Sequence, residues 1–231
     1  MDDNLKYPGK ELEIFDKAIL WRKYLFKKIK KYIGKEILEV GAGMGSFTKN
    51  YFQNDQKIVL SELDANLLEI LNDRFKKFSN IQIKSKYTKN IENQFDSILY
   101  ISVLEHIEDD IREIKTALDK LKNGGRVIIC VPAHNYMYSK FDKEIGHFRR
   151  YEINFFKKLK FHNANVEKCF MIDSMGWIIY FLNKIFFKKE DYPSKLKVMI
   201  WDKFFVPLSI ILDFITFYKF GKNILCIIRK N

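Results

Sequence analysis

Cysteine is scarce in this sequence, and the few that occur do not form the pattern of a disulfide framework or a zinc site. Cys130, Cys169 and Cys226 are an odd number, are widely spaced, and each lie in an apolar stretch. We therefore expect buried, reduced thiols in a cytoplasmic protein. No apolar run reaches the roughly 20 residues that span a bilayer, and the polar residues 1–4 argue against a secretory signal.

Arginine is also scarce, although the chain is basic. Only seven of the 41 cationic residues are Arg, and with 29 acidic residues the formal net charge is +12. Such a charge suits nucleic acid or an anionic membrane surface. The lysines are scattered along the chain, however, as is common in proteins encoded by AT-rich genes. We therefore do not expect nucleic acid to be a partner.

Strand and helix patterns alternate through the first 130 of the 231 residues, and no repeat or low-complexity linker divides them. The expected strands are 36–40, 57–60, 81–83, 95–102, 126–131, 166–172 and 223–228. The expected helices lie within 11–33, 46–52, 65–77, 109–122 and 152–161. This alternation predicts an α/β fold with a parallel sheet, helices on both faces, and a ligand site at the carboxyl ends of the strands.

A glycine-rich turn lies directly between the first expected strand and the next helix. Gly41, Gly43 and Gly45 are spaced G-x-G-x-G, which differs from the dinucleotide fingerprint G-x-G-x-x-G. Glycine allows a tight turn and the close approach of a ligand to the backbone. The motif alone is also compatible with a purely structural turn.

An acid closes the second expected strand. A carboxylate such as Glu62 at this point of an open α/β sheet can accept hydrogen bonds from both hydroxyls of an adenosine ribose. It would repel a 2′-phosphate, which argues against NADP. An NAD-dependent enzyme remains an alternative at this point, and Asp64 is better placed to cap the following helix.

Four segments in this order, 39–45, 61–64, 95–99 and 103–107, resemble those of class I S-adenosylmethionine-dependent methyltransferases. The resemblance covers about residues 35–132. It implies a Rossmann-like, seven-stranded, mostly parallel sheet with a reversed last strand, and S-adenosyl-L-methionine as the cofactor. It also divides the chain into N-terminal helices that cover the site (1–34), a cofactor-binding core (35–173), a helical cap insertion (174–222) and the final core strand (223–231).

The resemblance also implies which residues contact the cofactor. The glycine loop would pack on the methionine portion, Glu39 would orient its amino group, Glu62 would hold the ribose, and the end of the fourth strand would lie near the methyl group. Many relatives have an acid after the third strand that binds adenine, and here Tyr87 stands near that position. The implied contact residues are Glu39, Gly41, Ala42, Gly43, Gly45, Glu62, Leu63, Tyr87, Ile101 and Ser102.

A Glu-His pair follows the fourth strand, where the family often places active-site residues. We predict a catalytic role for His106 and a substrate contact for Glu105, with a loop-capping role for His106 as the alternative. Ubiquinone O-methyltransferases, which are similar here, bind a divalent metal with a further Glu three residues earlier. This chain has Ser102 at that position, so we expect a metal-independent enzyme.

The loop after the fifth strand, about residues 133–151, carries the remaining candidates. Its Asp-x-x-x-Gly-His-x-Arg-Arg-Tyr pattern resembles a subgroup of bacterial methyltransferases that are often associated with glycan or lipid-linked sugar assembly. We predict His147 as a general base and Arg149, Arg150 and Tyr151 as substrate-binding residues, since Arg can hold a phosphate or carboxylate. The alternative is that Asp142 pairs with an Arg and the motif only fixes the loop.

The insertion 174–222 is rich in Trp, Phe and Ile and carries Lys on its flanks. It suits a cap on the sheet, a homodimer interface, or a peripheral contact with the inner membrane surface. From all of this we predict O-methylation of a small acceptor, namely a sugar or lipid-linked glycan intermediate. Alternatives are a quinone or other prenyl lipid, RNA, and a non-catalytic scaffold with this fold.

Overall fold

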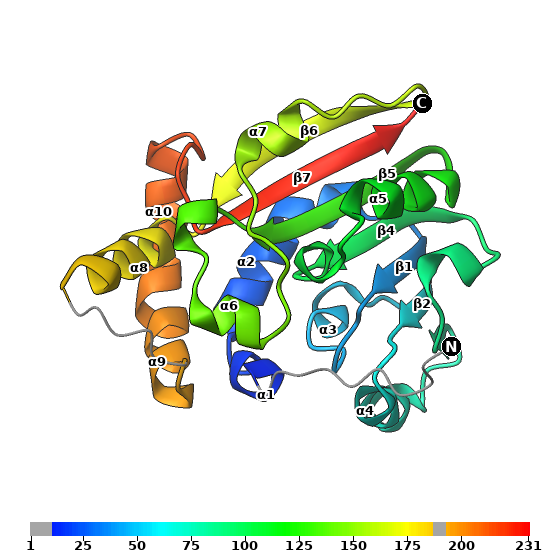
Figure 1. The fold of residues 1–231 in the computed structure, drawn as a ribbon. Helices are drawn as coiled ribbons and strands as arrows, with labels where there is room; N and C mark the ends of the chain where they lie inside the picture. Colours follow the sequence, from blue (N-terminus) through cyan, green and yellow to red (C-terminus); the bar gives the residue numbers. More distant parts are fainter. Residues whose placement is uncertain (1–10, 187–192) are drawn as a thin grey trace.

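The computed structural model describes residues 11–186 and 193–231. Residues 1–10 of the predicted N-terminal helical segment, and 187–192 of the predicted insertion, lie outside the described residues. The strands are β1 (Glu36–Val40), β2 (Lys57–Ser61), β3 (Ile81–Lys84), β4 (Phe95–Ile101), β5 (Leu121–Pro132), β6 (Ala164–Ile172) and β7 (Asn223–Lys230). They form one sheet in the order β3-β2-β1-β4-β5-β7-β6 (Figure 1).

The sheet is parallel from β3 to β5, whereas β7 runs antiparallel to both β5 and β6. This confirms the predicted seven-stranded fold with a reversed last strand. The central strands are continuous apolar runs because helices cover both faces of a parallel sheet. In β1, for example, Ile37 and Leu38 are both fully buried, in the two different hydrophobic clusters.

Helices occupy both faces and the end of the sheet where the parallel strands finish (Figure 1). They are α1 (Glu11–Phe15), α2 (Ile19–Ile29), α3 (Thr48–Tyr51), α4 (Ala65–Phe75), α5 (Asp110–Asp119), α6 (Lys140–Glu144), α7 (Ile153–Lys157), α8 (Ser174–Phe186), α9 (Lys195–Ile200) and α10 (Val206–Ile215). Residues of α5 and α7 share a core with one face of the sheet, and residues of α2, α3, α4 and α10 with the other. A π-helical turn, Trp201–Phe205, joins α9 to α10.

The largest difference from the predicted boundaries lies between α5 and β5. The helix expected over 109–122 ends at Asp119, and β5 begins at Leu121, five residues before the expected strand. Gly124 has a φ of 77°, and a Cβ on Gly125 would lie 2.9 Å from the carbonyl oxygen of Lys122. The two glycines therefore allow an irregular, closely packed strand, where we expected them to stop a helix.

Among the described residues, the predicted helical insertion contains α8, α9 and α10, and it lies between β6 and β7 in the chain. Among the residues that the structure describes, no helix is both long enough and apolar enough to cross a membrane.

Candidate functional site

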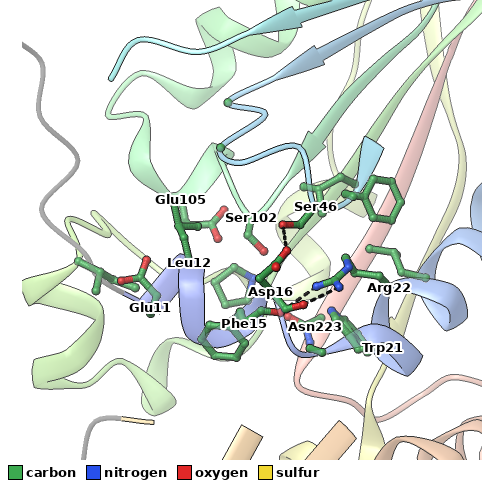
Figure 2. Close-up of a pocket in the computed structure, with 18 of the residues that line it drawn as sticks. Glu11, Leu12, Phe15, Asp16, Trp21, Arg22, Ser46, Ser102, Glu105 and Asn223 are labelled. Atoms are coloured by element: carbon green, nitrogen blue, oxygen red, sulfur yellow. Dashed lines mark hydrogen bonds between the residues drawn. The ribbon is translucent and has the colours of Figure 1, made fainter. Parts of the chain in front are cut away.

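A cavity of about 280 Å³ lies at the carboxyl ends of β1, β4 and β5. Its walls come from the glycine loop after β1, the turns after β4 and β6, the segment after β5, and the first residues of β7. Helices α1 and α2 close it from the N-terminal side (Figure 2). Arg22 of α2 donates to the carbonyl oxygens of Phe15 and Asp16, both at 2.8 Å, and Ser46 of the glycine loop donates to the Asp16 carboxylate.

The glycine loop has the backbone that only glycine adopts readily. Gly41 and Gly43 have φ values of 61° and 56°, in the left-handed region. A Cβ on Gly41 would lie 2.7 Å from a methyl carbon of Val103, whereas one on Gly43 would meet nothing closer than Leu12 at 3.7 Å. The loop therefore brings bare backbone to the cavity wall.

Glu39 lies at the end of β1 and is buried against the same wall. One of its carboxylate oxygens accepts hydrogen bonds from the Thr48 and Tyr51 hydroxyls, both at 2.6 Å. Burial raises the pKa of Glu39 to about 7, and these hydrogen bonds offset only part of that rise.

Glu62 supports the glycine loop directly. Its carboxylate accepts from the backbone N–H groups of Gly43 at 2.8 Å, Leu63 at 2.7 Å and Asp64 at 3.1 Å. Glu62 and Leu63 do not line the cavity, and neither does Tyr87, whose side chain is half exposed. The predicted ribose and adenine contacts thus lie beside the cavity, on the far side of the glycine loop.

Ile101 and Ser102 lie at the end of β4 and line the cavity. Ser102 has a φ of 56°, which is unusual for a residue other than glycine. Such backbone strain persists only where the surrounding structure maintains it, and it is commonest at functional sites.

Two cation-forming side chains of the segment after β5 converge on one carboxylate. Asp142 is fully buried; one of its oxygens lies 2.8 Å from His147 Nδ1, and both accept from Arg150 Nε at 3.0 and 3.1 Å. Burial alone would raise the pKa of Asp142, but the hydrogen bond from His147 and the charge of Arg150 hold it well below its usual range. An ionised carboxylate can only accept, so Nδ1 of His147 donates, and in the neutral tautomer with this proton Nε2 carries the lone pair.

The Glu-His pair after β4 lies next to this histidine. Glu105 Oε1 is 3.8 Å from His147 Nε2, and the rings of His106 and His147 meet edge to face at 4.6 Å. Burial raises the pKa of Glu105 to about 7, and burial together with the nearby His147 lowers the pKa of His106 to about 4. His106 is therefore neutral at pH 7, with a hydrogen bond to the backbone of Gly146.

Glu105, His106 and His147 each offer a ligand atom, and these atoms lie within 4.8 Å of one another. Two imidazoles and a carboxylate form a donor set that suits a divalent transition metal. Metal independence was predicted from Ser102 alone, because the sequence does not show that His147 reaches the Glu-His pair. That expectation stays a prediction, and the geometry supplies an alternative to it.

Comparison with known proteins agrees with this arrangement. Residues 13–173, about 70% of the chain, match the family described as Methyltransferase domain. The chain belongs to this methyltransferase family. The match confirms the predicted enzyme class.

Individual relatives are distant. The methyltransferase is 28% identical over 116 residues to a demethylmenaquinone methyltransferase of Tropheryma whipplei, spanning 49% of this chain and 48% of that protein. It is 38% identical over 64 residues to a probable ribosomal RNA small subunit methyltransferase A of Methanosarcina barkeri, covering 27% and 22% of the two chains. The chain thus spans about half the length, or less, of these curated relatives.

The structure of coclaurine N-methyltransferase bound to N-methylheliamine and SAH (S-adenosylhomocysteine) superimposes on this methyltransferase with a TM-score of 0.62 at 12% identity. The alignment covers 92% of this chain and 72% of that one. At this level of identity the likeness concerns the fold.

Two of the predicted substrate-binding residues of the methyltransferase lie outside the cavity wall. Arg149 donates to Asp110 at 2.9 Å and to the carbonyl oxygen of Glu108 at 2.8 Å. The buried Tyr151 hydroxyl donates to the same Asp110 carboxylate at 2.9 Å. Both side chains anchor the segment after β5 to the start of α5, and their substrate-binding roles stay predictions. Of the two adjacent arginines, Arg149 and Arg150, Arg150 lines the cavity and Arg149 does not.

The sequence analysis missed several charged residues of the cavity wall, among them Asp16 and Arg22 of the N-terminal segment. Two others are Asp173 and Lys222. They lie immediately after β6 and immediately before β7. Because β7 is reversed, its first residues meet the carboxyl ends of the parallel strands. The predicted reversal of the last strand was therefore a sufficient signal to place the residues before Asn223 at the site.

Proposed function

We propose that this methyltransferase transfers a methyl group from S-adenosyl-L-methionine to a hydroxyl oxygen of a small acceptor, namely a sugar or lipid-linked glycan intermediate. The observation that carries the proposal is the Asp142–His147 pair, which lines the same cavity as the glycine loop. We propose the cytoplasm as its compartment, since Cys130 and Cys226 are buried free thiols.

The cavity fits the cofactor in two respects. The backbone of Gly41 and Gly43 forms a wall free of side chains, and the buried Glu39 places a carboxylate near the loop for an amino group. In this proposal Glu62 holds the loop with three of its acceptor positions, and the remaining one receives a ribose hydroxyl. When bound, S-adenosylmethionine supplies an electrophilic methyl group on a good leaving group.

His147 removes the proton that the acceptor must lose. As the acceptor oxygen forms its bond to carbon, its O–H proton passes to Nε2 of His147, whose Nδ1–H remains hydrogen-bonded to Asp142. The ionised Asp142 stabilises the imidazolium that forms. Oxygen acceptors need such a base, because an alcohol is a weak nucleophile while it keeps its proton.

Arg150 and Lys222 favour an acceptor that carries an anion. Arg150 is 6% exposed, and its Nη1 has no hydrogen-bond partner among the residues that the structure describes. Lys222 lines the same cavity, and burial lowers its pKa. A phosphate or carboxylate would satisfy the unpaired guanidinium nitrogen and stabilise the Lys222 charge. A sugar phosphate, free or linked to a lipid, has this chemistry.

A quinone or other prenyl lipid is the second candidate, because a demethylmenaquinone methyltransferase is among the relatives. RNA is a third, supported by a shorter match to the probable ribosomal RNA methyltransferase. The resemblance to a glycan-associated subgroup with the Gly146–Tyr151 motif is a prediction that favours the sugar acceptor.

Labelled methyl transfer distinguishes these acceptors. Purified protein, labelled S-adenosylmethionine and an extract of the source cells are incubated, and the products are separated into aqueous, organic and macromolecular fractions. We expect organic-phase label that mild acid releases into water, as for a lipid-linked sugar phosphate, or aqueous label for a free one. Organic-phase label that resists acid would indicate a quinone or other prenyl lipid. Label that nuclease removes from the macromolecular fraction would indicate RNA. The absence of label from every fraction would indicate a non-catalytic scaffold.

A pair of glycine substitutions tests the cofactor site. Gly41 and Gly124 both have a positive φ. A Cβ added at Gly41 would lie 2.7 Å from Val103, whereas a Cβ added at Gly124 would lie 4.0 Å from its nearest neighbour, Arg229. We expect Gly41→Ala to weaken S-adenosylhomocysteine binding at least about tenfold by calorimetry, because the loop must shift. Gly124→Ala should carry a similar backbone strain and bind normally. Equal affinities in two folded variants would refute the loop's role.

A further inference from the structure

Helix α10 buries two polar side chains and exposes large apolar ones, the reverse of an ordinary surface helix. In α10 the buried side chains include Ser209 and Asp213, both fully buried. The outward side chains are large and apolar. We define the apolar face by six of these exposed side chains, namely Phe204, Leu208, Ile211, Phe214, Ile215 and Phe217.

The apolar face is continuous along the helix. Phe204, Leu208, Ile211 and Ile215 follow the i, i+4, i+7, i+11 spacing of one helical stripe, which runs from the π-helical turn through α10. Phe214 and Phe217 are 71% and 79% exposed beside it. A contiguous patch of this kind on a soluble protein marks a binding surface, because its exposure to water is unfavourable.

The buried acids explain how the stretch keeps this orientation. Within residues 193–220 the only acids are Asp202 and Asp213. Asp202 accepts from the backbone N–H groups of Leu20 and Trp21 at the start of α2, at 3.0 and 2.8 Å. Asp213 accepts from the Tyr24 hydroxyl at 2.7 Å. Both carboxylates thus fix the helices on α2, and the apolar side chains on the opposite side are exposed to solvent.

All the exposed charge of residues 193–220 is positive. It comes from Lys195, Lys197, Lys203 and Lys219, which are exposed around the apolar face. Lysines beside exposed Phe and Ile are complementary to anionic headgroups over an apolar interior. A second copy of the chain on this face would bring like charges together, which disfavours a homodimer.

We propose that the apolar face is a peripheral docking surface for an anionic lipid bilayer, with α10 lying in the plane of the interface. No described helix can cross a membrane, which fits a helix that lies on the surface. The opposite side of the same insertion faces the cavity through Trp201. Docking would therefore hold the cavity at the membrane surface. This surface stands independently of the acceptor proposed above.

Vesicle sedimentation tests the proposal with the purified full chain. The vesicles are phosphatidylcholine alone or with about 30 mol% phosphatidylglycerol. We expect the protein to bind the anionic vesicles and to be released by salt. The double substitution Ile211→Ser and Phe214→Ser should lower the bound-to-free ratio roughly tenfold or more. Lys203→Glu with Lys219→Glu should also reduce binding, on anionic vesicles only.

The matched control replaces two equally apolar residues elsewhere. Ile70 of α4 and Phe78, just beyond it, are each 38% exposed, and α4 lies on the side of the molecule away from α9 and α10 (Figure 1). Ile70→Ser with Phe78→Ser should leave vesicle binding unchanged within about twofold. Thermal unfolding and S-adenosylhomocysteine affinity confirm that each variant is folded.

Three results would overturn the proposal. They are wild-type protein that stays in the supernatant with anionic vesicles, equal binding by the two serine double variants, and a dimer in sedimentation velocity that Ile211→Ser with Phe214→Ser dissociates. The readout is binding, so a failure here leaves the proposed methyl transfer untouched, and an inactive enzyme that still binds vesicles leaves the docking surface intact.

Discussion

We expect His147→Ala to lower kcat by about 100- to 10,000-fold, the usual contribution of a general base, while S-adenosylhomocysteine affinity stays within about twofold. The physical reason is the fixed imidazole. Asp142 holds Nδ1 at 2.8 Å, and the backbone N–H of His147 donates to the Asp142 carbonyl oxygen at 2.9 Å, so Nε2 has one orientation. Steady-state kinetics with the acceptor found by fractionation provides the measurement.

Asp142→Asn separates positioning from general-base chemistry. The amide keeps the shape but neutralises the group that orients Nδ1 and pairs with Arg150. We expect a loss of kcat in this variant and an upward change in KM for an anionic acceptor, since Arg150 is no longer held. His162→Ala, a substitution at an exposed histidine, is the control and should retain full activity.

A metal role for His147 predicts a different pattern. If Glu105, His106 and His147 hold a cation, chelator should abolish wild-type activity, added metal should restore it, and Glu105→Gln should be as damaging as His147→Ala. If His147 is the base, chelator has no effect and Glu105→Gln keeps most of the activity. Full turnover by His147→Ala in the presence of chelator would eliminate both roles.

The sheet could be predicted from the sequence because buried parallel strands are apolar runs, and their alternation with helices fixes the topology. The glycine loop and the acid at Glu62 could be placed for the same reason, since the ends of neighbouring strands meet at one edge. The prediction failed at Gly124 and Gly125, because glycine stops a helix in one context and permits an irregular strand in another.

The segment after β5 shows what local sequence leaves open. Its Ser139-x-x-Asp142 spacing is a capping box, and the structure has both hydrogen bonds of that motif at the start of α6. This spacing predicts the start of a short helix, which the interpretation of residues 133–151 as a loop missed. The sequence does not show which arginine faces the cavity, because this depends on which of Asp142 and Asp110 each arginine contacts, and these two acids are distant from each other in the sequence.

The second large effect concerns stability. We expect Asp213→Ala to lower the free energy of unfolding by about 3–5 kcal/mol, because the removal of a buried acceptor leaves its donors unsatisfied. Asp213 is fully buried and accepts from the Tyr24 hydroxyl, from the backbone N–H of Asp173 at 2.9 Å, and from the N–H and hydroxyl of Ser174. It thus joins α10 to α2 and to the turn between β6 and α8.

Urea unfolding provides the measurement, and two further variants set the scale. Tyr24→Phe removes one donor and keeps the other hydrogen bonds of Asp213, so we expect the free energy of unfolding to fall by about 1 kcal/mol. Glu167→Ala breaks a largely exposed ion pair with Arg126 and should cost less than about 1 kcal/mol. A loss below about 1 kcal/mol in Asp213→Ala would mean that water replaces the carboxylate. The helix pair would then be held by apolar packing and by the Asp202 contacts with α2, and Asp213 would not be what orients the apolar face outward.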